Sequence, residues 1–288
     1  MTIEQPKITL VVPSYNQGLY LASSLQSIVD QRYPNLELFV MDGGSSDDSI
    51  EIIKTFGRHI AFWRSKPDGG QAAALAEAFT MGTGDLFGWL NSDDLLLPSS
   101  LEIYAHAYSN DPSRGVYIGD CLIIDKSGHI NNVSTPRHVT YNTMLFGRFG
   151  LCQPASMFTR RAYVDAGGIV DHYKFSFDLD LYLKLLARYK AVCLSAVTAC
   201  FRIHPASKTT QLEHVRIAES NTIRKSHRRY SVASRWGVHR PLYYYYRGTS
   251  LLLDVSARHM KRELRGNLSS STVQDAFAQK TRELRRRD

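Results

Sequence analysis

The first 95 residues alternate between short apolar runs and helical segments in a way that few folds accommodate. Strands are predicted over four runs: Ile8–Val12, Leu36–Met41, Ile60–Trp63 and Leu86–Leu90. Each run ends in a loop of small or polar residues, and segments with helical apolar spacing follow. Consecutive strands joined by helices run parallel with right-handed crossovers. The pattern therefore predicts an α/β fold with a mostly parallel, twisted sheet flanked by helices.

The pattern becomes looser after residue 95. Helices are predicted near Ser99–Tyr108, Arg160–Ala166 and Asp178–Tyr189, and strands near Val116–Ile124, Ile130–Val133 and Ala191–Ile203. We interpret residues 1–210 as one domain, with a first half of about 1–95 and a second half of about 96–210. A chain of 288 residues is long enough for such a domain and an extension.

The net charge of +8 is concentrated near the C-terminus. Residues 212–288 hold 17 Lys and Arg against 7 Asp and Glu. We interpret residues 211–288 as a basic helical extension, with a helix over Pro241–Arg265 that has an apolar stripe. This helix could pack on the domain or lie on an anionic membrane surface. Basic charge without a binding motif gives no expectation of nucleic-acid binding.

The remaining composition is that of a globular protein. Apolar residues make up 43% of the chain, and no run is long enough to span a bilayer. We find no secretory signal. The four cysteines show no Cys-x-x-Cys spacing, which favours reduced thiols over a zinc site or disulfides. These features together predict a cytoplasmic protein, with peripheral attachment to the inner face of the membrane as an option.

Acidic residues follow three of the four predicted strands. Asp42 ends the second strand, Asp68 follows the third, and Asp93 and Asp94 follow the fourth. Carboxyl ends of parallel strands meet at the crevice where ligands bind. Carboxylates there suit nucleotide hydroxyls, base N–H groups or a hard divalent cation. Each acid alone could instead cap a loop, but their recurrence favours a nucleotide site.

Several motifs in this chain resemble those of family 2 glycosyltransferases, which are inverting enzymes with the Rossmann-like GT-A fold. The motifs cover roughly residues 7–210 and are Val11–Gly18, Met41–Asp47, Pro67–Gln71, Gly88–Asp94, Cys152–Ala155, Gly167–Gly168, Phe177–Leu181 and Phe201–His204. They occur in order and at ordinary spacing. The resemblance implies a nucleotide-diphosphate sugar donor, UDP- or dTDP-linked, and Mn²⁺ or Mg²⁺.

The resemblance also implies roles for individual residues. The nucleotide would be bound by Pro13, Tyr15, Asn16, Asp42, Asp68, Gln71 and Asp93, with Asp42 on the base and Asp93 near the ribose or sugar. Asp94 would hold the metal, and His204 could add a ligand. Asn91 departs from the Asp-x-Asp pattern of the family, which leaves open whether Asp93 or Asp94 binds metal directly.

The later motifs concern the acceptor. Asp178 occupies the position of the family's catalytic base, which would deprotonate the incoming hydroxyl. From the residues alone, Asp178 could be a helix N-cap and Asp180 a first-turn acid; we interpret Asp180 as structural or supporting. Gln153, Arg202 and Lys208 are candidates for contacts with the acceptor or the phosphates.

The predicted function is metal-dependent, inverting sugar transfer to a saccharide or lipid-linked saccharide in cell-surface polysaccharide synthesis. Two alternatives stay open. One is a nucleotidyltransferase of similar sheet architecture, although a Gly-rich basic phosphate loop is missing near the first strand. The other is a non-catalytic module that binds nucleotides or glycans.

Overall fold

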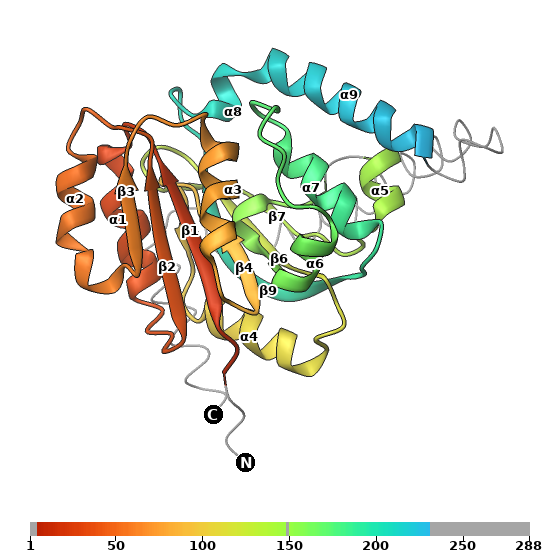
Figure 1. Cartoon of the computed structure of the whole chain (residues 1–288), viewed down its shortest axis with the longest axis horizontal. Helices are drawn as coiled ribbons and strands as arrows, with labels where there is room; N and C mark the ends of the chain where they lie inside the picture. The colour runs from red at the N-terminus through yellow and green to blue at the C-terminus, as the bar shows by residue number, and fades with distance from the viewer. Residues whose placement is uncertain (1–4, 148–149, 231–288) are drawn as a thin grey trace.

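The computed structural model describes residues 5–147 and 150–230 (Figure 1). Its strands are β1 (Ile8–Ser14), β2 (Leu36–Asp42), β3 (Phe62–Ser65), β4 (Leu86–Trp89), β5 (Leu95–Leu96), β6 (Val116–Ile124), β7 (Ile130–Ser134), β8 (Ser156–Thr159) and β9 (Ala191–Arg202). Its α-helices are α1 (Gly18–Val29), α2 (Ser49–Thr55), α3 (Gln71–Met81), α4 (Ser100–Asn110), α5 (Tyr141–Phe146), α6 (Arg160–Asp165), α7 (Phe177–Leu186), α8 (Lys208–Gln211) and α9 (Glu213–Tyr230). Short 3₁₀ helices span Gly57–His59 and Gln153–Ala155.

The described strands form one sheet in the order β3-β2-β1-β4-β8-β6-β9-β5, with β7 paired to β6. The first four strands are parallel, as the sequence predicts. Beyond them the sheet is mixed. β8 runs antiparallel to both β4 and β6, and β9 is parallel to β6 but antiparallel to β5. The parallel half therefore supplies one common edge for the loops that follow its strands.

Helices cover both faces of the sheet, which explains why β1 is buried along its whole length. Val11 packs in a cluster with residues of α3, α6 and α7, whereas Leu10 and Val12 pack with residues of α1 and α4. Successive side chains of a strand point to opposite faces. A strand covered on both faces therefore has a continuous apolar sequence, not an alternating one.

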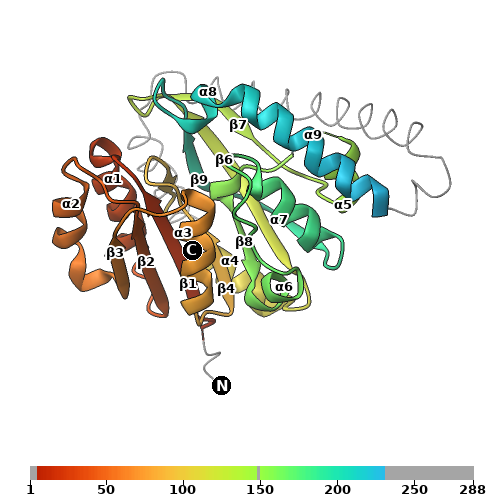
Figure 2. The same ribbon diagram turned by 45° about the horizontal axis from the view of Figure 1, so that its top comes forward.

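The last described helix, α9, lies along α7 and α5 at one side of the molecule (Figure 2). Ile223 of α9 is fully buried in the cluster that contains α7. Arg224 donates hydrogen bonds to the carbonyl oxygens of Leu145 and Gly147, both at 2.9 Å. Residues 213–230 thus pack on helices α5 and α7 of the second half of the domain.

The predicted helix over residues 241–265 lies outside the described residues. Within the described part of the chain, no helix is both long and apolar enough to cross a membrane.

The structure differs from the sequence prediction at several short elements. The third strand begins at Phe62, two residues later than expected, because the Gly57–His59 turn continues to Ile60, whose N–H bonds the carbonyl of Gly57. The elements β5, α5 and β8 were not predicted. All three are at most six residues long, which is too short for a periodic pattern to emerge.

Candidate active site

The loops that follow β2, β3 and β4 meet at one edge of the parallel half of the sheet. Ser14 at the end of β1 is in register with Asp42 at the end of β2, and Asp42 with Ser65 at the end of β3. The second half of the chain also reaches this edge, because Lys208 Nζ lies 3.1 Å from Gln71 Oε1 at the start of α3. Both halves therefore contribute to the site.

Asp93 and His204 form a close pair at this edge. His204 Nε2 lies 3.0 Å from Asp93 Oδ2, and the His204 ring centroid lies 4.8 Å from that of Tyr20 in α1. The side chain of Asp93 is 17% exposed and that of His204 is 5% exposed. A carboxylate oxygen is a suitable ligand for Mn²⁺, and imidazole nitrogen is a common metal ligand in proteins.

Asp94, in contrast, is enclosed by protein. It is fully buried, Oδ1 accepts the backbone N–H of Arg202 at 2.8 Å, and Oδ2 accepts Asn91 Nδ2 at 2.9 Å. Burial and the neighbouring charge of Asp93 raise the pKa of Asp94 well above its usual range. Its contacts fix the end of β9 against the loop after β4.

Asn91 connects the side chains of both halves. Its Oδ1 accepts Gln71 Nε2 at 2.7 Å, and its Nδ2 lies 3.4 Å from Gln153 Oε1. Gln153 is buried and donates to the carbonyl of Trp89 at 2.8 Å. The amide of Asn91 therefore serves as both donor and acceptor, which a carboxylate at this position could not do.

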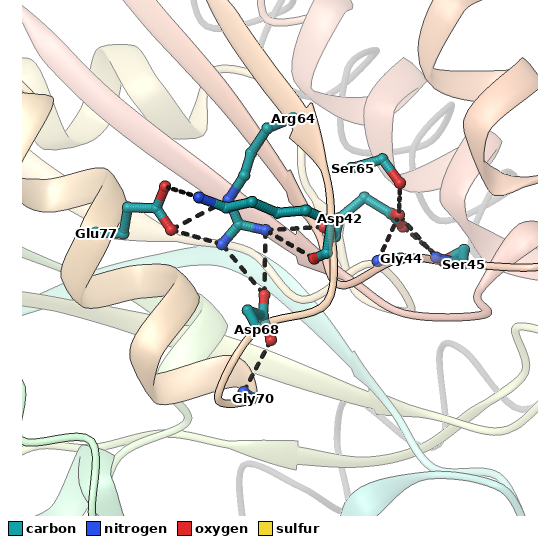
Figure 3. A network of polar contacts seen from close by, with 9 residues as sticks. Asp42, Gly44, Ser45, Arg64, Ser65, Asp68, Gly70 and Glu77 are labelled. Carbon is teal, nitrogen blue, oxygen red and sulfur yellow. Dashed lines mark hydrogen bonds and ion pairs between the residues drawn. The ribbon is translucent and has the colours of Figure 1, made fainter.

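Asp42 is fully buried and binds its own loop (Figure 3). Its Oδ2 accepts the N–H groups of Gly44 and Ser45 and the hydroxyl of Ser65, at 2.6–3.0 Å, and its Oδ1 accepts the hydroxyl of Ser45 at 2.5 Å. Gly44 has a φ of +86°, a conformation that favours glycine. The loop-capping interpretation of Asp42 describes the contacts seen here.

Arg64 joins three acidic or carbonyl groups beside this loop (Figure 3). It donates to the carbonyl of Asp42 at 2.8 Å, to Asp68 Oδ2 at 3.2 Å and to Glu77 Oε2 at 2.8 Å. Asp68 Oδ1 accepts the N–H of Gly70 at 2.8 Å, next to the start of α3. The guanidinium thus fixes the loop after β3 against β2 and α3.

The loop after β1 lies beside the Asp42 loop. Asn16 Oδ1 accepts the N–H of Ser46 at 2.8 Å, and the Asn16 N–H donates to Ser45 Oγ at 2.8 Å. Pro13 is buried within β1, whereas Tyr15 is 62% exposed. A large exposed aromatic at the end of a buried strand is available to stack on a planar ligand.

Asp178 lies in the first turn of α7 and is half-buried. Its Oδ1 accepts the N–H of Leu179 at 2.7 Å, and Oδ2 makes no hydrogen bond within residues 5–147 and 150–230. Burial raises the pKa of Asp178 to about 6, against the lowering effect of Lys208. A carboxylate with one unpaired oxygen and a pKa near neutrality has the properties of a general base.

Both carboxylate oxygens of Asp180 are engaged by neighbouring side chains. Lys184 Nζ lies 2.6 Å from Oδ2, and His227 Nε2 of α9 lies 3.2 Å from Oδ1. Although burial raises its pKa, hydrogen bonds from His227 and Lys184 produce a net lowering. Asp180 joins α7 to α9.

The side chain of Arg202 is also engaged by protein. Its Nε donates to the carbonyl of Asp93 at 2.8 Å, its Nη1 lies 3.3 Å from the carbonyls of Asp125 and Lys126, and its guanidinium lies over the ring of Tyr20. These contacts hold the loop after β4. Lys208, whose ammonium lies near the rings of Phe175 and Phe177, is the more accessible cation.

Comparison with known proteins identifies the family of the chain. The sequence model described as glycosyl transferase family 2 matches residues 9–167. The chain is a family 2 glycosyltransferase. This glycosyltransferase is 25% identical over 236 residues to an uncharacterized glycosyltransferase of Rickettsia typhi, covering 76% of this chain and 72% of the relative. It is 27% identical to a chondroitin synthase of Escherichia coli, covering 62% of this chain but only 26% of that protein.

Solved structures of transferases share the fold and identify it as GT-A. The structure of S. aureus TarS 1-349 in complex with UDP-GlcNAc aligns with a TM-score of 0.59 at 15% identity, covering 83% of this chain and 79% of that one. The mannosyltransferase PcManGT of Pyrobaculum calidifontis, in complex with GDP-Man and Mn²⁺, aligns with a TM-score of 0.58 at 17% identity. That alignment covers 93% of this chain and 84% of the mannosyltransferase.

Three residues of the site region were missed from the sequence. Arg64, Tyr20 and Glu219 make contacts that organise its loops. Arg64 could have been noticed, because it precedes the motif residue Asp68 by four positions. Tyr20 and Glu219 lie on helices and carry no local signal. Among the described residues, no group of three His, Cys, Asp or Glu side chains could by itself hold a metal.

Proposed function

We propose that this glycosyltransferase carries out metal-dependent, inverting transfer of a sugar from a UDP- or dTDP-sugar to a saccharide or lipid-linked saccharide. The proposed pathway is cell-surface polysaccharide synthesis. The observation that carries the proposal is the environment of Asp178. Its raised pKa and unpaired Oδ2 suit a group that must accept a proton from an incoming hydroxyl. Relatives named chondroitin synthase and hyaluronan synthase support a saccharide acceptor.

The donor nucleotide is proposed to lie along the edge formed by the loops after β1, β2 and β3. Tyr15 would stack on the base, and Pro13 and Asn16 would shape the side of the pocket. Asp42 and Asp68 already accept hydrogen bonds from their own loops. Asp42 and Asp68 would therefore hold the backbone of their loops in place around the base. Their carboxylate oxygens could also accept a hydrogen bond from the nucleotide. Gln71 would position Asn91 from the other side.

Asp93 and His204 fit a divalent cation better than Asp94 does. Both oxygens of Asp94 are engaged and the carboxyl is buried, whereas Asp93 and His204 present a paired oxygen and nitrogen. We assign direct metal contact to Asp93 and His204, and a positioning role to Asp94. A bound Mn²⁺ or Mg²⁺ would supply neutralisation of the charge that develops on the departing diphosphate.

The chain's own groups carry the remaining steps. Asp178 Oδ2 would accept the proton of the acceptor hydroxyl as that oxygen attacks the anomeric carbon from the face opposite the diphosphate. Lys208 would stabilise phosphate charge, and Gln153 would orient the sugar or acceptor through Asn91. Arg202 would act indirectly, because its guanidinium holds the carbonyl of Asp93.

Calorimetric titration with UDP, dTDP, GDP and ADP, each with and without Mn²⁺, tests the donor assignment. Metal-dependent binding of UDP or dTDP supports it. Two S. aureus TarS structures contain UDP and UDP-GlcNAc, and the Pyrobaculum structure contains GDP-Man. Uridine and guanosine nucleotides therefore both belong among the ligands tested. Tight binding of GDP alone would overturn the pyrimidine assignment while leaving sugar transfer intact.

The two alternatives give different results in the same experiments. A nucleotidyltransferase would release pyrophosphate from a nucleoside triphosphate. A non-catalytic module would bind a nucleotide but would be indifferent to Asp178→Asn.

The C-terminal residues offer a route to a lipid-linked acceptor at the cytoplasmic face of a membrane. Their excess of Lys and Arg would attract anionic lipid. Co-sedimentation with anionic liposomes tests this, with a chain truncated after Ser234 as the control. Equal sedimentation of both folded proteins would contradict peripheral attachment through the tail.

A further inference from the structure

The segment that leads into the helix of Asp178 is held by one carboxylate from another helix. Glu219 of α9 accepts three successive backbone N–H groups: Lys174 on Oε1 at 2.8 Å, and Phe175 and Ser176 on Oε2 at 2.9 and 2.8 Å. These three residues directly precede α7, which begins at Phe177. Glu219 therefore satisfies three successive backbone donors that end at Ser176, the N-cap of α7.

Ser176 adds two further links between the same elements. Its hydroxyl lies 3.3 Å from the carbonyl oxygen of Arg216 and 3.1 Å from the hydroxyl of Ser220. Arg216, Glu219 and Ser220 lie within about one turn of one face of α9. The segment 174–176 is thus attached to α9 by five hydrogen bonds on adjoining turns, immediately before Asp178.

Phe175 of this segment and Phe177, the first residue of α7, both lie beside the ammonium of Lys208. Its Nζ lies 5.9 Å from the ring centroid of Phe175 and 5.5 Å from that of Phe177. The charged and titratable groups that act on Asp178 come from three elements: Lys208 of α8, Glu219 of α9 and Tyr182 of α7. Movement of residues 174–176 would change the position of Asp178 and its distance from Lys208 together.

We propose that Glu219 is a positioning residue for the transfer reaction, fixing residues 174–176 so that Asp178 Oδ2 faces the acceptor hydroxyl. The consequence for the reaction rests on the proposed function of Asp178 as the base. The anchoring itself does not. A displacement of reacting groups by about 1 Å can cost about a hundredfold in rate, so a side chain that touches no substrate can still control kcat.

The first variant to make is Glu219→Gln. It keeps the shape of the side chain but replaces one acceptor oxygen by an NH₂ group, which faces backbone N–H donors. The matched control is Glu213→Gln, which removes the same charge from the same helix at an exposed position, where the Glu213 carboxylate forms an ion pair with Arg216. Glu219→Asp keeps the charge and shortens the side chain by one methylene.

Two measurements on the full chain need no substrate. Hydrogen exchange reports the amides of residues 174–176 directly. Carboxyl ¹³C NMR, with the resonance assigned by Asp178→Asn, reports the titration of Asp178. In Glu219→Gln we expect these amides to exchange at least about tenfold faster. We expect the pKa of Asp178 to fall, because a repelling charge is lost and the carboxyl becomes better hydrated. Glu219→Asp should speed exchange with a smaller change in pKa.

Turnover is then measured as nucleoside diphosphate release from UDP-GlcNAc, UDP-glucose, dTDP-glucose and GDP-mannose. We expect Glu219→Gln to lower kcat between about tenfold and a hundredfold, with the donor KM unchanged within about twofold. A purely structural role would lower the amount of folded enzyme without separating kcat from KM.

The outcomes distinguish the two proposals. Exchange rates and an Asp178 titration that match those of Glu213→Gln would overturn the anchoring by Glu219. Faster exchange and a lower pKa with unchanged kcat would overturn its role in the reaction. If Asp178→Asn itself keeps normal turnover, the proposed base is wrong, while the exchange and titration data still decide whether Glu219 holds the segment. If Glu219→Gln does not fold, Glu219→Asp gives the same comparison.

Discussion

His204 Nε2 lies 3.0 Å from Asp93 Oδ2, which joins the segment after the last strand of the sheet to the loop after β4. The pair is 111 residues apart in the chain and both members are largely buried. Asp94, the next residue, is fully buried and accepts the N–H of Arg202. Adjacent carboxylates thus differ in what they can bind.

We expect Asp93→Asn and His204→Ala each to weaken Mn²⁺-dependent nucleotide binding by about tenfold or more, because each removes one of the two proposed protein ligands. Calorimetric titration of UDP, with and without Mn²⁺, measures the effect. The affinity of both variants for UDP in the absence of Mn²⁺ should differ little from that of the unmodified protein.

Asp94→Ala is the comparison for that experiment. It leaves the buried N–H of Arg202 without its acceptor, so it should lower the free energy of unfolding by about 1–3 kcal/mol. If folded Asp94→Ala bound UDP without any effect of Mn²⁺, and Asp93→Asn bound it as the unmodified protein does, Asp94 and not Asp93 would be the metal ligand.

The pKa of Asp178 predicts how activity depends on pH. Burial raises this pKa to about 6, and a base acts only when it is deprotonated. The value of kcat/KM should therefore rise with pH up to about 6 and then level off. Asp178→Asn should lower kcat by about 10²–10⁴-fold and remove this dependence. Steady-state rates between pH 5 and 8 measure both effects, and an acidic limb that persists in Asp178→Asn would assign it to another group.

The same shift predicts that Asp178 destabilises the fold at neutral pH. Its folded pKa lies above the unfolded value, so the stabilisation that protonation gives is complete below the unfolded pKa and is lost as pH rises through about 6. Asp178→Asn is neutral at every pH and should raise the free energy of unfolding at pH 7.5 by about 1–3 kcal/mol. Urea unfolding at pH 7.5 and pH 4 checks this. The difference in free energy of unfolding between Asp178→Asn and the unmodified protein should be smaller at pH 4.

Much of the fold could be predicted because β1, β2 and β4 are buried on both faces. Continuous apolar runs such as Leu86–Leu90 are typical of strands in this position. The strand β8 could not be predicted, because it has four residues and its place between β4 and β6 depends on pairing with distant segments.

The site could be predicted as a set of loops but not as a set of contacts. Parallel strands bring Asp42, Asp68 and Asp93 to one edge, which follows from topology alone. Which oxygen remains available depends on neighbours that the sequence does not reveal, such as Ser65 beside Asp42 and the N–H of Arg202 beside Asp94. The pairing of Asp93 with His204 likewise depends on the path of β9.

Arg64 provides the last prediction, because its guanidinium reaches three groups on three elements (Figure 3). Its side chain is 9% exposed, so few water molecules can replace these contacts. Lysine has one compact ammonium and cannot span the same acceptors. Arg64→Lys should therefore loosen the loops after β2 and β3 and weaken UDP binding by about tenfold, whereas Arg64→Ala should cost about 3–5 kcal/mol of stability by leaving Asp68 unpaired.

Lys66→Ala is the matched control for Arg64→Lys. Lys66 also contacts Glu77, at 3.1 Å, but its side chain is 58% exposed and the pair should contribute at most about 1 kcal/mol. Calorimetric titration of UDP and thermal unfolding are measured for all three variants. Nucleotide affinity that is the same in Arg64→Lys, Lys66→Ala and the unmodified protein would mean that the base is bound away from the Asp42 and Asp68 loops. The stability loss in Arg64→Ala would then report only the cost of an unpaired buried carboxylate.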